Sequence, residues 1–494
     1  MLYYITLFMG KQQTRKKYNK YNHSVCDNKM TFEDCELAIL RQAVDDNEET
    51  QGKKIVNTAE IKSILKIVED FLIKKKLMCY GGTAINNILP SYDQFYNRDA
   101  EIPDYDFYSP DALKDAKELT DIYYKNGYTD AEAKAGVHHG TYKVYVNFIP
   151  IADITQLEPN LYKSLFKQSL LVAGIRYVPA NFLRMGMYLE LSRPAGDVSR
   201  WEKVLKRLTL LNKHYPLKSS KCDSIDFQRK MSVDDDINSK IYLTARDTLI
   251  NNGVVFFGGY AYSLYSQYIS NKDSRTKTRK HTPDFDVLSD DIDKTALILQ
   301  EQLEELGATN IKSMEHAALG ELLPRRIQVA VGDETIAFIY EPIACHNYNV
   351  VNVKGTSVKV ATIDTILSFY LGFTYLNSPE YDADRLLCMS SYLFHVQEKN
   401  RLSQKGLLKR FNIDCFGKQP TKESIRAEKA SKYREIKKNS KYYEEWFLNY
   451  NPANIERLKL EKKEKIEKTK EKKKHLEEKS NKTKKKKSKL FPFL

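Results

Sequence analysis

The chain has 494 residues, of which 42% are hydrophobic, so it is too long for one compact domain and can bury substantial cores. Its formal net charge is +14, and residues 455–494 carry 17 Lys and Arg against 7 Glu, so the body of the chain is only mildly basic. No stretch is long and apolar enough for a membrane span, and the charge order at the N-terminus is wrong for a secretory signal.

Seven cysteines are scattered along the chain, with no CxxC pair and no Cys/His set at zinc spacing. An odd number without a framework argues against structural disulfides and favours a reducing compartment. We therefore expect a protein that is not secreted.

The first elements in chain order are helical. Residues 1–29 are expected to form a flexible basic arm. Thr31 predicts a capped helix start that runs to Val44, and the polar run 45–54 is expected to end that helix. Apolar residues between 55 and 73 follow helical spacing, and this second helix leads directly into a strand.

The stretch Leu77-Met-Cys-Tyr-Gly-Gly-Thr-Ala-Ile-Asn86 reads as a buried strand that turns sharply and starts a helix. Glycine suits such a turn, and free N–H groups at a helix start can bind phosphate. The predicted phosphate ligands are Gly81, Gly82 and Thr83. Asn86, one helical turn further, could reach a phosphate or a sugar, and a plain helix-surface role is an equal alternative.

The following stretch, Ile102-Pro-Asp-Tyr-Asp-Phe-Tyr-Ser109, predicts a short strand. Residues two apart on a strand point the same way, so Asp104 and Asp106 should project together. Paired carboxylates are hard oxygen ligands that suit Mg²⁺ or Mn²⁺. A phosphate cradle beside a divalent-metal site indicates nucleotidyl transfer.

A helix from Pro110 is followed by residues Thr141 to Ile154, which alternate in polarity and predict one long strand. Asp153 near its end supplies the third carboxylate that a two-metal site needs. Lys143, earlier on that strand, could reach the phosphates.

Residues 160–215 are predicted to be helical. Four basic residues on the last helix could contact a triphosphate or an RNA backbone: Arg200, Lys203, Lys206 and Arg207. An ordinary solvated face paired with Glu202 is the equally supported alternative. The polar residues 218–236 are the expected domain linker.

The same pattern then occurs a second time. Val254-Val-Phe-Phe-Gly-Gly-Tyr-Ala-Tyr262 matches the glycine stretch, and His281-Thr-Pro-Asp-Phe-Asp-Val-Leu-Ser289 matches the aspartate stretch. In Glu341-Pro-Ile-Ala-Cys345, the position that matches Asp153 is Cys345. We infer an internal duplication with the chemistry in the first copy and a structural or RNA-holding role for the second.

Taken together, these motifs resemble the poly(A) polymerase catalytic subunits of large DNA viruses, of the mimivirus and African swine fever virus type and, more distantly, the poxvirus type. The similarity extends to Tyr188-Leu-Glu-Leu-Ser-Arg-Pro194 and Asp197-Val-Ser-Arg-Trp-Glu-Lys-Val204. It implies an α+β fold of two tandem polymerase-β-like nucleotidyltransferase modules, the second degenerate, with helical additions and a basic tail. The expected divisions are a catalytic module at 30–217, a second module at 237–420 and a charged helical, then disordered Lys-rich tail at 421–494.

The resemblance also implies template-independent addition of AMP from ATP to mRNA 3′ ends with Mg²⁺ or Mn²⁺. It implies a homodimer or, alternatively, a separate processivity subunit, and a location in the host cytoplasm at the viral factory or in the virion. Two alternatives stay open: another terminal RNA nucleotidyltransferase (CCA, uridylyl or oligoadenylate type), and a non-catalytic RNA-binding scaffold.

Overall fold

The structure, a computed structural model, describes residues 25–490 except 28, 218–221, 223–226, 228–235, 269–283, 320–321, 377, 379 and 439. Only the backbone is described for 236–238, 475 and 477–490. Most of the predicted arm and linker, and the lysine side chains near the C-terminus, therefore lie outside the described residues. None of the helices within the described part is long and apolar enough to cross a membrane.

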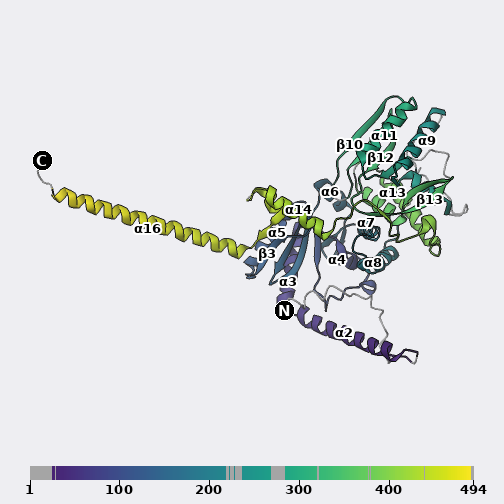
Figure 1. Cartoon of the computed structure of the whole chain (residues 1–494). Coiled ribbons are helices and arrows are strands. Elements are labelled where there is room, and N and C mark those ends of the chain that lie inside the picture. Colours follow the sequence, from purple (N-terminus) through teal and green to yellow (C-terminus); the bar gives the residue numbers. More distant parts are fainter. Residues whose placement is uncertain are drawn as a thin grey trace.

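Two eight-stranded sheets form the framework (Figure 1). The first has the order β16-β3-β4-β5-β2-β1-β7-β6 and the second β10-β11-β12-β9-β8-β14-β13-β15. The strands of the first are β1 (Met78–Cys79), β2 (Tyr105–Ser109), β3 (Ala131–Ala135), β4 (Thr141–Val146), β5 (Ile149–Gln156), β6 (Leu170–Val172), β7 (Ile175–Tyr177) and β16 (Asn449–Tyr450). Those of the second are β8 (Val255–Phe256), β9 (Phe285–Leu288), β10 (Ile311–His316), β11 (Arg326–Val331), β12 (Glu334–Tyr340), β13 (His346–Val353), β14 (Thr356–Ala361) and β15 (Cys415–Phe416).

Apart from one edge strand in each sheet, the second order repeats the first strand for strand. The predicted tandem architecture is therefore confirmed. The helices of the first half are α2 (Phe32–Val56), α3 (Ala59–Lys75), α4 (Gly81–Ile88), α5 (Ala112–Lys125), α6 (Pro159–Lys167), α7 (Ala180–Leu191) and α8 (Trp201–His214). Those of the second half are α9 (Asp236–Asn251), α10 (Gly259–Tyr265), α11 (Ile292–Glu305), α12 (Ile363–Phe373), α13 (Ala383–Lys399), α14 (Lys422–Glu435), α15 (Lys441–Phe447) and α16 (Pro452–Leu490).

The β2 strand separates an apolar face from a polar one, as its alternation requires. Tyr105 and Phe107 are buried, and the Phe107 ring lies 6.4 Å from that of Phe71 on α3. The α3 and α5 helices pack against this side of the first sheet. The intervening Asp104 and Asp106 therefore face the other side.

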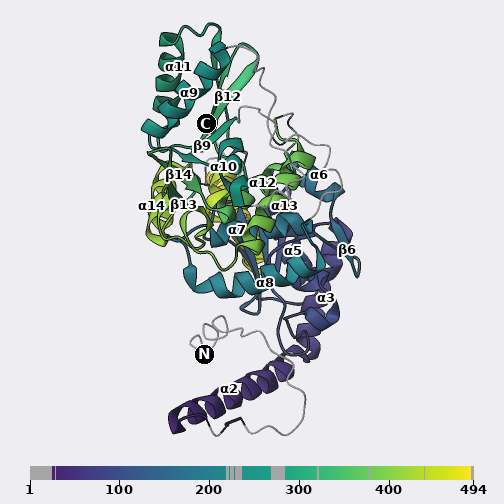
Figure 2. The ribbon, with the colours of Figure 1, turned by 90° about the vertical axis from the view of Figure 1, so that its right-hand side faces the viewer.

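The two modules meet through equivalent helices, because α7 follows β7 as α12 follows β14, and α7 packs against α12. The rings of Phe182 and Tyr375 lie 5.5 Å apart across this contact, edge to face. The backbone N–H of Asn347 donates to the Ser192 carbonyl at 2.8 Å. Figure 2 shows α7 and α12 near the centre of the molecule.

The chain returns to the first module after the second is complete. The β16 strand pairs with β3 in antiparallel register, and Lys117 forms an ion pair with Glu444 at 2.6 Å. The segment predicted as the start of a tail therefore extends the first sheet. After β16, the α16 helix projects away from the body as a single long helix (Figure 1).

Three local predictions are wrong. The range 160–215, predicted to be helical, contains the paired strands β6 and β7 between α6 and α7. The first helix does not end at the polar run but continues to Val56, because those residues stay solvated on a projecting helix with pairs such as Glu49–Lys53 at 3.0 Å. The predicted long strand 141–154 is a hairpin of β4 and β5, which turns at Asn147 and Phe148, both with positive φ.

The expectation of no disulfides is also wrong. Six cysteines pair as Cys26–Cys35, Cys222–Cys388 and Cys345–Cys415, and the buried Cys79 is free. Two of these pairs join residues 166 and 70 positions apart, so tertiary folding brings them together and no spacing motif announces them. The inference of a reducing compartment loses this support.

Candidate active site

The glycine turn presses the start of α4 against β2. Gly81 has a φ of +74°, and a Cβ added there would lie 2.4 Å from Oδ2 of Asp106. The Tyr80 N–H donates to the Asp106 carbonyl at 2.9 Å, which fixes the strand end beside the turn. A side chain at position 81 would be strained by the backbone and blocked by the carboxylate.

Three aspartates come together on the open face of the sheet. Asp106 is the direct register partner of Asp153 on the parallel neighbour β5, so both side chains leave the sheet on the same side. Asp104, two residues before Asp106, shares that side. The arrangement that the sequence predicted is therefore present: two acids from one strand and one from the next.

The three carboxylates carry like charges and repel one another. Burial, followed by the negative charges of Asp104 and Asp153, raises the pKa of Asp106 to about 8. Loss of hydration and the charge of Asp153 raise the pKa of Asp104 to about 6, although this residue keeps solvent contact. The nearby positive groups only partly offset these effects, so the cluster favours a cation.

Lys143 lies in the cluster. It is the cross-strand partner of Asp153 in the β4–β5 hairpin, and its ammonium forms an ion pair with the Asp153 carboxylate. Burial lowers the pKa of Lys143, but the hydrogen bond to Asp153 and the negative charges around the ammonium together outweigh burial and raise it. In this arrangement the lysine neutralises the third carboxylate.

The donor set suits a divalent cation. Within the described part of the chain, no group of three or more His, Cys, Asp or Glu side chains is arranged to hold a metal ion. Three carboxylates, two of which have raised pKa values (Asp104 and Asp106), are nonetheless the oxygen donors that Mg²⁺ and Mn²⁺ prefer. Asp104, Asp106 and Asp153 would hold such an ion once Asp153 shares its oxygens between the ion and Lys143.

Two residues predicted as phosphate ligands have structural hydrogen bonds. The Thr83 hydroxyl donates to the Asp104 carbonyl at 2.7 Å, which leaves its backbone N–H at the helix start. Asn86 is 1% exposed, and its Oδ1 accepts the N–H groups of Phe95 and Tyr96 at 2.8 and 2.9 Å. Asn86 is therefore a loop anchor and does not face the site, a correction to both sequence interpretations.

The four basic residues of the 200–207 segment do not act alike. Burial lowers the pKa of Lys203, and the positive charges of Arg207 and Arg200 lower it further, so these three lie together. Arg200 pairs with Glu190 at 3.0 Å, and its charge also reaches Asp106. Lys206 is instead paired with Glu202 along the helix, which matches the solvated-face alternative for this residue.

Sequence reasoning missed Tyr96 at this site. Its hydroxyl accepts a hydrogen bond from Arg207 Nη2 at 2.7 Å. A Cβ on Gly82 would lie 2.5 Å from this hydroxyl. The loop between the glycine and aspartate motifs has no periodicity, so no sequence signal marks the residue.

The second module lacks the third acid, as predicted. The residue that stands in its place, however, is not the one that the sequence indicated. Asp286 on β9 has Phe338 on β12 as its register partner, in the place that Asp153 takes in the first sheet. Cys345 lies beyond β12 and is bonded to Cys415. The shared Pro-Ile-Ala sequence equated Cys345 with Asp153. Equivalent positions are instead defined by strand register, which places Phe338 there. Asp284 and Asp286 are 2% and 8% exposed, so this copy of the site is closed.

Comparison with known proteins agrees with this geometry. Residues 66–197 match the family model described as the poly(A) polymerase catalytic subunit. The family resemblance is confirmed. A relative from African swine fever virus (strain Badajoz 1971 Vero-adapted), named as such a subunit, is 32% identical over 187 residues, 37% of this chain and 39% of that protein. One from Acanthamoeba polyphaga mimivirus, similarly named, is 28% identical over 234 residues, 44% of this chain and 38% of that protein.

These curated relatives are matched over less than half of their length. The crystal structure of the Megavirus polyadenylate synthase superposes with a TM-score of 0.73 at 20% identity and covers 92% of both chains. At that identity the likeness establishes the shared fold, which includes the tandem modules.

Proposed function

We propose that the chain is a template-independent poly(A) polymerase that transfers AMP from ATP to the 3′ end of viral mRNA. The observation that carries this proposal is the register of Asp106 with Asp153, which gathers three carboxylates beside the glycine turn. The names of the relatives support adenylate as the nucleotide added.

In this proposal the chain binds and orients both substrates. The N–H groups of Gly82 and Thr83 and the cations Arg207 and Lys203 hold the triphosphate at the start of α4. The three aspartates hold divalent ions, Mg²⁺ or Mn²⁺. Bound there, such ions lower the pKa of an attacking 3′-hydroxyl and stabilise charge on leaving pyrophosphate.

The cation of Lys143 holds Asp153 in place before and during binding. Because it lies on the edge of the acidic cluster, it also limits the repulsion that an incoming triphosphate meets. The main role of Lys143 is thus to hold Asp153 in place, and contact with a phosphate is a secondary role.

The partners and location are proposals of the same kind. RNA is the acceptor, and the chain works as a homodimer or with a separate processivity subunit. The host cytoplasm, at the viral factory, is the proposed location, with packaging in the virion as a further possibility.

The test is extension of a labelled RNA with each NTP supplied singly. Preferential use of ATP is expected, and equal use of UTP or CTP would remove the poly(A) claim. The double change Asp104→Ala, Asp106→Ala should abolish extension, whereas Asp284→Ala in the closed second copy should leave the rate within about twofold. Wild-type extension by the double variant would instead favour a scaffold that only binds RNA.

A further inference from the structure

Arg207 lies directly over the glycine turn. A Cβ on Gly82 would be 3.0 Å from Arg207 Nη1 and 2.5 Å from the Tyr96 hydroxyl, so both groups contact the Gly82 backbone. The guanidinium thus lies at the start of α4, and the negative charge of Asp106 acts on the Tyr96 hydroxyl that the guanidinium contacts. A triphosphate bound there would meet this side chain first.

The loop before the aspartate motif holds the guanidinium in a defined plane. Its Nη2 donates to the Tyr96 hydroxyl at 2.7 Å, and its carbon lies 4.7 Å from the Phe95 ring centroid and 5.4 Å from that of Tyr96. Guanidinium is planar and has five N–H donors, so it can keep these contacts and still donate to a phosphate. An arginine already held in this way loses less entropy when the phosphate binds.

The loop is itself fixed to the helix that starts at the glycine turn. Asn86 on α4 accepts the Phe95 and Tyr96 N–H groups through one oxygen, at 2.8 and 2.9 Å. Its Nδ2 donates to Asn87 Oδ1 at 3.2 Å, and Asn87 donates to the Tyr177 hydroxyl at 2.9 Å. The contacts therefore form a closed ring from the turn through α4, the 95–96 loop and α8 back to the turn.

We propose that Asn86 and Tyr96 are positioning residues that hold Arg207 over the glycine turn, where it receives the triphosphate of the incoming nucleotide. This inference rests on the proposed function. It assigns Asn86 an indirect part in binding, and it gives the 95–96 loop a role that the motifs on either side of it do not reveal.

The experiment is a double-mutant cycle on Tyr96 and Arg207, with the KM for ATP and kcat measured by RNA extension. Tyr96→Phe keeps the ring and removes the hydroxyl acceptor, so it should raise the KM for ATP about fivefold with kcat nearly unchanged. Arg207→Ala should raise this KM by about 30-fold. In the Arg207→Ala background, Tyr96→Phe should have no further effect, because the hydroxyl acts only through the guanidinium.

Tyr92→Phe is the matched control. Tyr92 is 65% exposed and its ring lies against His214, away from Arg207, so its change should leave the KM for ATP as in the wild type. Calorimetric binding of ATP to each variant gives a second readout that needs no RNA.

Multiplying effects of Tyr96→Phe and Arg207→Ala, or an unchanged KM for Tyr96→Phe, would overturn the positioning role while wild-type extension still supports the polymerase. Failure of the wild type to extend RNA with any NTP would reject the proposed function itself. The two failures are thus distinguishable.

Discussion

Replacing Asp106 with Asn should stabilise the folded chain while it abolishes catalysis. Burial and the charges of Asp104 and Asp153 raise the pKa of Asp106 to about 8, from an ordinary value of 3.8. The folded state therefore keeps a proton that the unfolded state releases near pH 4. Wherever the folded state binds more protons, stability falls as pH rises.

The pH window follows from these two values. The loss of stability begins as pH rises through about 4 and is complete above about 8. At pH 7, proton linkage alone would make the loss about 4 kcal/mol. The solvent contact that Asp106 retains screens its charge and reduces this to about 2 kcal/mol. Asn is neutral at every pH and isosteric, so Asp106→Asn should recover that amount, or about 4 °C in Tm, at pH 7 and only about a quarter of it at pH 4.5.

Thermal unfolding of both proteins in metal-free buffer between pH 4.5 and 8 measures this directly. Asp290→Asn, at an exposed position of the second module, is the control and should leave Tm unchanged at each pH. A Tm difference that is negative, or that is the same at all pH values, would refute the electrostatic reasoning. RNA extension by Asp106→Asn should fall by at least about 100-fold, since the cation site loses an anionic ligand.

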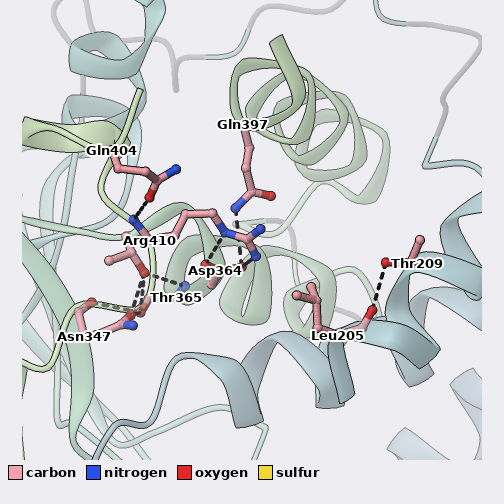
Figure 3. Close-up of polar contacts among 9 residues, drawn as sticks. Leu205, Thr209, Asn347, Asp364, Thr365, Gln397, Gln404 and Arg410 are labelled. Atoms are coloured by element: carbon pink, nitrogen blue, oxygen red, sulfur yellow. Dashed lines mark hydrogen bonds and ion pairs between the residues drawn. The ribbon is translucent and has the colours of Figure 1, made fainter. Parts of the chain in front are cut away.

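Three further outcomes are expected. Gly81→Ala should lower the free energy of unfolding by about 2 kcal/mol more than Gly127→Ala, because both have positive φ but only the former meets Asp106 Oδ2; equal losses in denaturant titrations would mean that the turn relaxes. Arg410→Ala should lower the free energy of unfolding by about 3 kcal/mol in the same assay. The reason is that Arg410 binds both oxygens of the fully buried Asp364 carboxylate, at 2.7 and 3.2 Å (Figure 3). A change under about 1 kcal/mol would show that solvent reaches the carboxylate. Thiol titration of the denatured, unreduced protein should find one thiol per chain, that of Cys79, and a result of seven would contradict the pairings.

The candidate site could be predicted largely because its elements obey local rules. Alternation along a short strand places Asp104 and Asp106 on one side, and a diglycine between a strand and a helix marks a tight turn. The third acid, Asp153, could be predicted because it lies among apolar residues near the end of the next alternating segment. What alternation could not reveal is the hairpin at 147–148, which turns Lys143 onto Asp153.

The parts that escaped prediction depend on long-range contacts. The β16 strand joins β3 across more than 300 residues of chain, and the disulfides link residues that folding alone brings together. The ring through Asn86, Phe95, Tyr96 and Arg207 is likewise tertiary. Reading Asn86 as a surface or phosphate-contacting residue failed because its partners are backbone N–H groups, which carry no sequence signature.

The register of the two sheets explains why three acids come together in the first copy and not in the second. In the first, Lys143 and Asp153 are cross-strand partners, and in the second the equivalent pair is Gln328 and Phe338. The cation and the acid have thus both been replaced, so the second sheet has no third carboxylate and no charge to support one.

Polar side chains at the equivalent place in the second module form hydrogen bonds with one another. Gln328 bonds to Thr335 at 2.6 Å and to His316 at 2.9 Å, and the Tyr340 hydroxyl reaches Asp286 at 3.2 Å. Because these side chains are committed to one another, restoring an acid at 338 alone would bury an unsupported charge and would not rebuild a site. The second module still contributes to the first through the packing of its α12 helix against α7.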